Sequence, residues 1–274
     1  MYAHQVIEDL KRIVVEGDKK IVNTGMVSNA MFRIGQSQSF HMGDYSGIIN
    51  TFSVDKGKKI PVYIQEEFMR PPYPVTWIDF HYNGDKFGRL AMEFDDAMYV
   101  IPFCKIKGDE TWTPQVFYFG FRNGEGYLGV SALFSTEYIQ GMSIKSDIEK
   151  HAMSYHLTSG TLICNFNQLI TCKNIGTVDN EPSDKLNKSR VKKGKQPIFT
   201  YKTLVIKPTS KRQESLEAQG LWENRIHLCR GHFKEYSDEK PLFGKYTGRY
   251  WWQPSVRGRN TEGVVMKDYE VKST

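Results

Sequence analysis

Between Val75 and Phe134 short apolar runs alternate with turn sequences, and this pattern constrains the fold more than any other feature. The runs are rich in Val, Ile, Phe, Tyr and Trp, the residues that strands favour. Two of the turns contain Asn83-Gly84 and Asn123-Gly124, a dipeptide typical of tight hairpins. With two similar runs upstream, the pattern predicts an antiparallel sheet or half-barrel of strands at Gly47–Val54, Ile60–Ile64, Val75–Tyr82, Gly88–Phe94, Met98–Phe103, Gln115–Phe121 and Tyr127–Phe134.

Helical periodicity flanks this region on both sides. From Ala3 to Glu16 the apolar residues recur at intervals of three and four, and Gly17 is a suitable stop. A second short helix is predicted over Asn23–Phe32, ended by Gly35. Downstream, Ser143–Lys173 regains helical spacing and predicts two helices broken near Ser159-Gly160.

Charge is distributed unevenly along the chain. Lys185–Arg259 contains 18 Lys and Arg against 6 Asp and Glu, whereas the remainder contains 19 basic and 25 acidic residues. A strongly basic segment is typical of polyanion binding, because Lys and Arg neutralise phosphates and release counterions; a plain solvated surface is the alternative.

The fold class that these patterns predict is α+β, with N-terminal helices packed on an antiparallel sheet and a small basic C-terminal β module. The expected organisation is a helix–sheet–helix domain over 1–180, a basic linker or arm over 181–197, and a β-rich basic module over 198–274. Four strands are predicted to form one sheet in the module: Ile198–Ile206, Arg225–Tyr236, Gly248–Val256 and Gly263–Val271.

Several classes of protein are not expected from this sequence. It contains neither a long apolar run nor a signal-peptide pattern, so a cytoplasmic protein without a membrane span is predicted. Its four cysteines form no C-x-x-C pair, which predicts reduced thiols rather than a zinc site or a disulfide framework. No metal or cofactor is expected.

The segment Ile226–Phe233 contains the candidate catalytic residues. Strand alternation places Arg230 and His232 on one face and His227 on the other. A bulge at Gly231 would bring the two histidines together, as general acid and base require. A structural role in the strand is the alternative for each histidine.

The strand Arg249–Arg257 is the expected partner, with Arg257 as a second phosphate ligand and one aromatic face exposed for base stacking. If both tryptophans are core residues, that stacking role is lost. The candidate nucleic-acid-binding residues are Lys188, Arg190, Lys192, Lys193, Lys195, Arg249, Trp251 and Trp252. Outside this region, alternation allows a carboxylate–histidine pair of Asp79 with His81, although a solvated sheet face is favoured there.

Several of these segments resemble a family of uncharacterised phage and prophage proteins. The resemblance lies in the pattern His227-x-x-Arg230-Gly231-His232, followed by Tyr250-Trp-Trp252, Val256-Arg-Gly258 and Lys267-Asp-Tyr269. It implies a virus-encoded protein that acts inside a bacterial cell, but it brings no established fold, activity or catalytic residues.

The leading hypothesis is a phage-encoded nucleic-acid-binding protein, with RNA favoured over DNA. Its candidate reaction is metal-independent RNA cleavage, in which His227 and His232 are base and acid, and Arg230 and Arg257 hold phosphate. The rival hypothesis is a non-enzymatic inhibitor or adaptor that binds a host protein, either host machinery or anti-phage defence.

Overall fold

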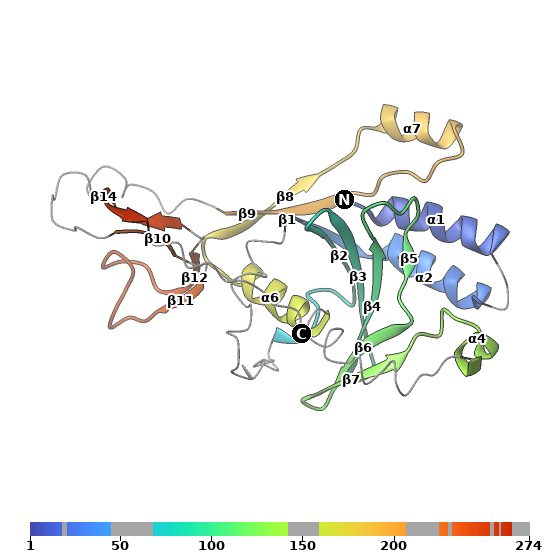
Figure 1. Ribbon diagram of the computed structural model, residues 1–274, viewed down its shortest axis with the longest axis horizontal. Helices are drawn as coiled ribbons and strands as arrows, with labels where there is room; N and C mark the ends of the chain where they lie inside the picture. Colours follow the sequence, from blue (N-terminus) through green and yellow to red (C-terminus); the bar gives the residue numbers. More distant parts are fainter. Residues whose placement is uncertain are drawn as a thin grey trace. The chain divides into compact units, whose positions relative to one another are not determined.

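The computed structural model describes residues 1–17, 21–44, 68–141, 159–206, 225–229, 232–252, 255–257 and 259–264 (Figure 1). The chain divides into two compact units. Unit 1 holds the described residues up to Thr171 together with Gly176–Val205. Unit 2 holds Cys172–Ile175 and the described residues from Ile206 onward.

A large mixed sheet forms the centre of unit 1. Its strands follow the order β7-β6-β4-β3-β2-β1-β9-β8, with the short β5 paired to β4. β1 runs parallel to both β2 and β9, whereas the strands from β2 to β7 pair antiparallel. The strands are β1 (Gln38–Asp44), β2 (Val75–Tyr82), β3 (Asp85–Phe94), β4 (Ala97–Lys105), β5 (Thr113–Pro114), β6 (Phe117–Arg122), β7 (Glu125–Val130), β8 (Ile175–Asn180) and β9 (Tyr201–Ile206).

The predicted hairpin turns are confirmed. Asn83 and Gly84 have φ angles of 52° and 88°, and Asn123 and Gly124 have φ angles of 53° and 81°. Two successive positive φ angles match the twist of the flanking strands, which explains the Asn-Gly sequence. The antiparallel prediction holds for β2 to β7. The strand β1 was not predicted, and its parallel pairing with β2 and β9 makes the sheet mixed. Two predicted strands, Gly47–Val54 and Ile60–Ile64, lie outside the described residues.

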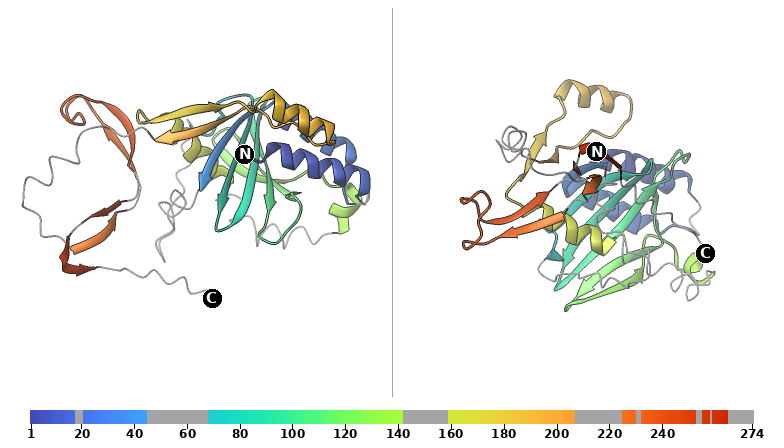
Figure 2. Two further views of the ribbon diagram at one scale, coloured as in Figure 1. Left: turned by 90° about the horizontal axis from the view of Figure 1, so that it is seen from above. Right: turned by 60° about the vertical axis from the view of Figure 1, so that its left-hand side comes forward.

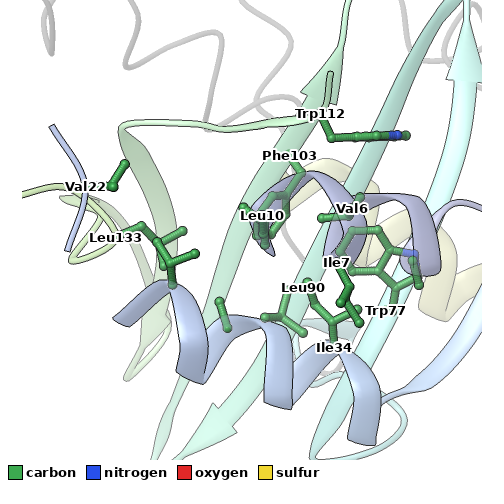
Figure 3. Packing of buried hydrophobic residues seen from close by; sticks show 13 residues of the cluster. Val6, Ile7, Leu10, Val22, Ile34, Trp77, Leu90, Phe103, Trp112 and Leu133 are labelled. Carbon is green, nitrogen blue, oxygen red and sulfur yellow. The ribbon is translucent and has the colours of Figure 1, made fainter. Parts of the chain in front are cut away.

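Helices cover both faces of this sheet. α1 (Ala3–Glu16) and α2 (Thr24–Gln36) lie on one face, and α6 (Thr161–Ile170) lies on the other (Figure 2). Beneath α1 and α2, the apolar core contains three fully buried residues from successive strands, Trp77, Leu90 and Phe103 (Figure 3). No helix in the described part of the chain is long and apolar enough to cross a membrane.

The predicted helices agree with the structure except at some ends. α1 begins and ends as expected, and Gly17 follows it. α2 starts after Asn23, whose side chain accepts a hydrogen bond from the Met26 amide (3.2 Å). It continues through Gly35 to Gln36, so the predicted stop at Gly35 is wrong. α6 follows Gly160 as predicted, whereas the helix expected before Ser159 lies outside the described residues. The short α4 (Thr136–Gly141) was not predicted.

The basic segment 181–197 contains a helix, α7 (Asp184–Lys192), where a linker or arm was expected. The Ser183 hydroxyl caps it by accepting the Leu186 amide (3.4 Å). The next strand, β9, pairs with β1 in the large sheet, so it is not part of a C-terminal four-stranded sheet. The boundary between the units accordingly falls near Ile206.

Unit 2 contains two small sheets in its described part. One has the order β13-β10-β14 and the other pairs β11 with β12. The segment Cys172–Ile175 joins this unit through Asn174, whose side chain accepts the Trp251 amide (2.9 Å) and donates to the Trp251 carbonyl (2.7 Å). The strands are β10 (Arg225–Cys229), β11 (His232–Tyr236), β12 (Gly248–Trp252), β13 (Ser255–Arg257) and β14 (Arg259–Val264).

Candidate functional site

The predicted catalytic segment forms two strands rather than one. In the first, β10, His227 is the backbone partner of Arg257 on β13. In the second, β11, the exposed His232 is the partner of Trp252 on β12. The structure therefore brings His227 and Arg257 to adjacent strands, while Arg230 lies outside the described residues.

Gly231, where a bulge was expected, lies outside the described residues. The described pairing places His227 on β10 beside β13, and His232 on β11 beside β12, in two separate sheets. The expectation that the two histidines act together stays a prediction.

The aromatic residues of β12 divide between core and surface in an unexpected way. Trp251 is 4% exposed and packs against Phe233, with ring centroids 4.8 Å apart. It is a core residue, so the prediction that Trp251 stacks on a base is wrong. Trp252 is half-buried. The Arg249 guanidinium binds the Glu235 carboxylate (2.9 Å), so it is already engaged within unit 2.

The remaining candidates gather on α7 and the turn after it, in unit 1. Five lysines there are exposed, and among the described residues none of them is paired with a carboxylate. We call this group the lysine surface: Lys185, Lys188, Lys192, Lys193 and Lys195.

Arg190 differs from these lysines because it attaches α7 to the body of unit 1. Its guanidinium donates to the Glu8 carboxylate of α1 (2.7 Å) and to the Gln196 carbonyl (2.8 Å). The same Glu8 oxygen accepts the Gln196 amide (2.8 Å), and the Lys11 ammonium donates to the Gln196 side chain (2.9 Å). Arg190 thus fixes the helix beside α1, while the lysine surface stays in solvent.

A second group of polar residues surrounds the buried carboxylate of Asp79 on β2. Asp79 is fully buried, so the expected solvated sheet face is wrong at this position. Its Oδ1 accepts a hydrogen bond from His41 Nδ1 (2.5 Å). Its Oδ2 accepts the Tyr2 amide (2.6 Å) and the Trp77 indole N–H (2.8 Å). The carboxylate–histidine pair therefore exists, but its histidine is His41 rather than His81.

The parallel pairing of β1 and β2 creates this contact, because it sets His41 opposite Asp79. The imidazole is partly open, with 21% of its side chain exposed. The rings of Tyr2 and Tyr201 stand edge-on to it at centroid distances of 5.7 and 6.3 Å. The Lys86 ammonium lies 5.3 Å from the Tyr2 ring. We call this group the His41 site: Tyr2, His41, Asp79, Lys86 and Tyr201.

Sequence reasoning found Asp79 but not its partner. β1 is a polar segment with only two buried residues, Ser39 and Phe40, so it gave no strand signal. A histidine before a predicted sheet can be suspected of pairing with a carboxylate, but only the strand order identifies which one.

No group of three or more His, Cys, Asp or Glu side chains is arranged to hold a metal ion within the part of the chain that the structure describes. Comparison with protein-family models gave no match, and neither the curated proteins nor the solved structures contain a match to this chain. The resemblance to phage proteins stays a prediction. The lysine surface and the His41 site, both in unit 1, are the two candidate functional regions.

Proposed function

We propose that this protein binds nucleic acid, RNA ahead of DNA, through the lysine surface of α7. The observation that carries the proposal is the set of five exposed lysines on one fixed helix and its following turn, without a carboxylate partner among the described residues. Lysines that are free of ion pairs can exchange their counterions for backbone phosphates, which is the main source of affinity for nucleic acids.

The attachment of α7 supports the same reading. A helix fixed by Glu8, Arg190 and Gln196 presents its charges without a large loss of conformational entropy on binding. In unit 2, by contrast, the Arg249 guanidinium is paired with Glu235 and the Trp251 ring is buried, so neither side chain is available to contact nucleic acid. Under this proposal, α7 makes the principal contact with nucleic acid, and unit 2 provides an additional basic region.

Salt-dependent binding to a labelled single-stranded RNA tests this proposal. If all five lysines contact phosphates, the logarithm of the association constant falls against the logarithm of salt concentration with a slope of about −3.5. In the double variant Lys188→Gln, Lys192→Gln this slope should become less negative by about 1.4, because two phosphate contacts are removed. The matched control is Lys107→Gln, Arg122→Gln, which removes the same charge from two exposed residues of unit 1 outside the lysine surface.

Two results would overturn it. One is the absence of RNA and DNA binding at low salt. The other is an equal loss of affinity in the test and control variants, which would show that net charge alone attracts the nucleic acid.

One observation favours the rival function of an inhibitor or adaptor that binds a host protein. Leu186 and Val191 on α7 are 45% and 56% exposed, as apolar contact residues of an interface would be. Under this alternative, immobilised protein captures one stoichiometric partner from bacterial lysate after nuclease treatment. Leu186→Ser should abolish that capture while leaving RNA affinity unchanged.

A further inference from the structure

The His41 site contains a histidine whose tautomer is fixed by its surroundings. Asp79 is an acceptor when ionised, so the 2.5 Å contact requires the Nδ1 of His41 to carry the proton. In the neutral imidazole, the lone pair is then on Nε2, the nitrogen that does not face Asp79. A buried carboxylate that orients an imidazole in this way is the usual arrangement for a general base.

The two oxygens of Asp79 have different roles. Oδ2 takes the Tyr2 amide and the Trp77 indole N–H, which hold the start of α1 and a core side chain on the sheet. Oδ1 takes His41, whose side chain remains 21% exposed. The anchoring of α1 by Oδ2 does not require His41. The contact between Oδ1 and His41 therefore has a separate role, which is to orient the imidazole.

The neighbours of His41 suit a nucleotide. The aromatic rings of Tyr2 and Tyr201 lie next to the His41 imidazole. Aromatic side chains in proteins commonly contact nucleic-acid bases and ribose. The Lys86 ammonium beside the Tyr2 ring supplies a positive charge for a phosphate. The lysine surface lies in the same unit, on the helix that Glu8 attaches to α1.

We propose that His41, oriented by Asp79, is a catalytic general base that cleaves RNA; this inference rests on the proposed nucleic-acid binding. His41 Nε2 takes the proton of a ribose 2′-hydroxyl, and the 2′-oxygen forms a bond to the adjacent phosphorus. The bond from phosphorus to the 5′-oxygen breaks, and that oxygen takes a proton from water. The imidazolium then returns its proton to the resulting hydroxide. The products are a 2′,3′-cyclic phosphate and a 5′-hydroxyl end.

The test is cleavage of an end-labelled oligoribonucleotide by the full chain, with RNA affinity measured in parallel. We expect cyclic phosphate ends from the RNA and no cleavage of the oligonucleotide with 2′-deoxy sugars. His41→Ala and His41→Gln should lower the cleavage rate by about 100-fold or more while RNA affinity changes less than about twofold. Free imidazole should restore cleavage by His41→Ala, a response that a purely structural role would not produce.

His81→Ala is the matched control, because His81 lies on the same strand as Asp79 but has no hydrogen bond to it in the described structure. It should cleave at the wild-type rate. Binding of RNA without cleavage would overturn this inference and leave the proposed function intact. Wild-type cleavage rates in both His41 variants would also overturn it. Absence of RNA binding would instead overturn the proposed function.

Discussion

At the scale of single residues, the buried carboxylate of Asp79 joins the start of α1 to β2. Asp79→Ala removes the acceptor of the Tyr2 amide and the Trp77 indole N–H, and leaves both donors without it. Each unsatisfied buried donor costs about 1–3 kcal/mol, so the free energy of unfolding should fall by about 3 kcal/mol. Urea unfolding monitored by tryptophan fluorescence measures this change.

Asp109→Ala provides the comparison for that measurement, because Asp109 is exposed. Its free energy of unfolding should stay within about 0.5 kcal/mol of the wild type. Equal effects of the two substitutions would contradict the role assigned to Asp79.

His4, in the first turn of α1, makes stability depend on pH. Burial and, to a lesser extent, the nearby Arg190 guanidinium lower the pKa of His4 from 6.5 to about 4. Between these two pH values the unfolded chain binds a proton that the folded chain does not. The free energy of unfolding should therefore decrease as pH falls from about 6.5 towards 4.

Denaturant unfolding at pH 7 and pH 5 tests this dependence. The wild type should lose more stability between the two pH values than His4→Leu, which has no group to protonate at this position. If both proteins lose the same amount, protonation of His4 is not the cause.

At the scale of elements, close approach of an aromatic ring to the backbone fixes the pairing of β2 and β3. A Cβ added to Gly88 would lie 2.4 Å from ring atoms of Trp77, a fully buried core residue. Gly88→Ala should lower the free energy of unfolding by about 1–3 kcal/mol, because the indole must move within a packed core. Thermal unfolding with near-ultraviolet circular dichroism follows both stability and the Trp77 environment.

The control for this substitution is Gly35→Ala in the last turn of α2, where an added Cβ meets nothing within 4 Å. Alanine favours the helix over glycine, so this variant should be more stable by about 0.5 kcal/mol. A loss of stability at Gly35 as large as that at Gly88 would rule out the proposed ring contact as the cause.

The elements that could be predicted are those encoded by local sequence. α1 has an apolar stripe that predicts a helix. The hairpins at Gly84 and Gly124 contain Asn-Gly, a dipeptide that favours the positive φ angles of a tight hairpin turn. α7 has no buried residue, so no apolar stripe distinguished it from a linker. Its helical state depends instead on the Ser183 cap and on the contact between Arg190 and Glu8, 182 positions earlier in the chain.

At the scale of the whole molecule, the same distinction separates the two candidate sites. The lysine surface was visible in the sequence because its residues are neighbours in the chain. The His41 site was not, since Tyr2, His41, Asp79 and Tyr201 meet only when β1 inserts between β2 and β9. A parallel strand pair has no local sequence signal comparable to a hairpin turn, so its partners cannot be identified from spacing alone.

The two units also differ in how the chain builds them. The short segment Cys172–Ile175 belongs to unit 2, although it lies between two stretches of the chain that belong to unit 1. Its Asn174 side chain is hydrogen-bonded to both the amide and the carbonyl of Trp251. The Lys173 amide adds a bond to the Arg249 carbonyl (2.8 Å). This turn segment between α6 and β8 therefore contributes three hydrogen bonds to the backbone of β12, at Arg249 and Trp251.

Asn174→Ala should consequently destabilise unit 2 without unfolding unit 1. The substitution leaves the buried Trp251 backbone without both hydrogen bonds, a loss of about 2 kcal/mol or more. Hydrogen exchange measured by mass spectrometry should show faster exchange in peptides covering β11 and β12, with unchanged protection in β2 to β4. Asn180→Ala, which removes a side chain bonded to Tyr201 and Thr203 in unit 1, is the reciprocal control. Faster exchange throughout both units in Asn174→Ala would mean that they unfold together.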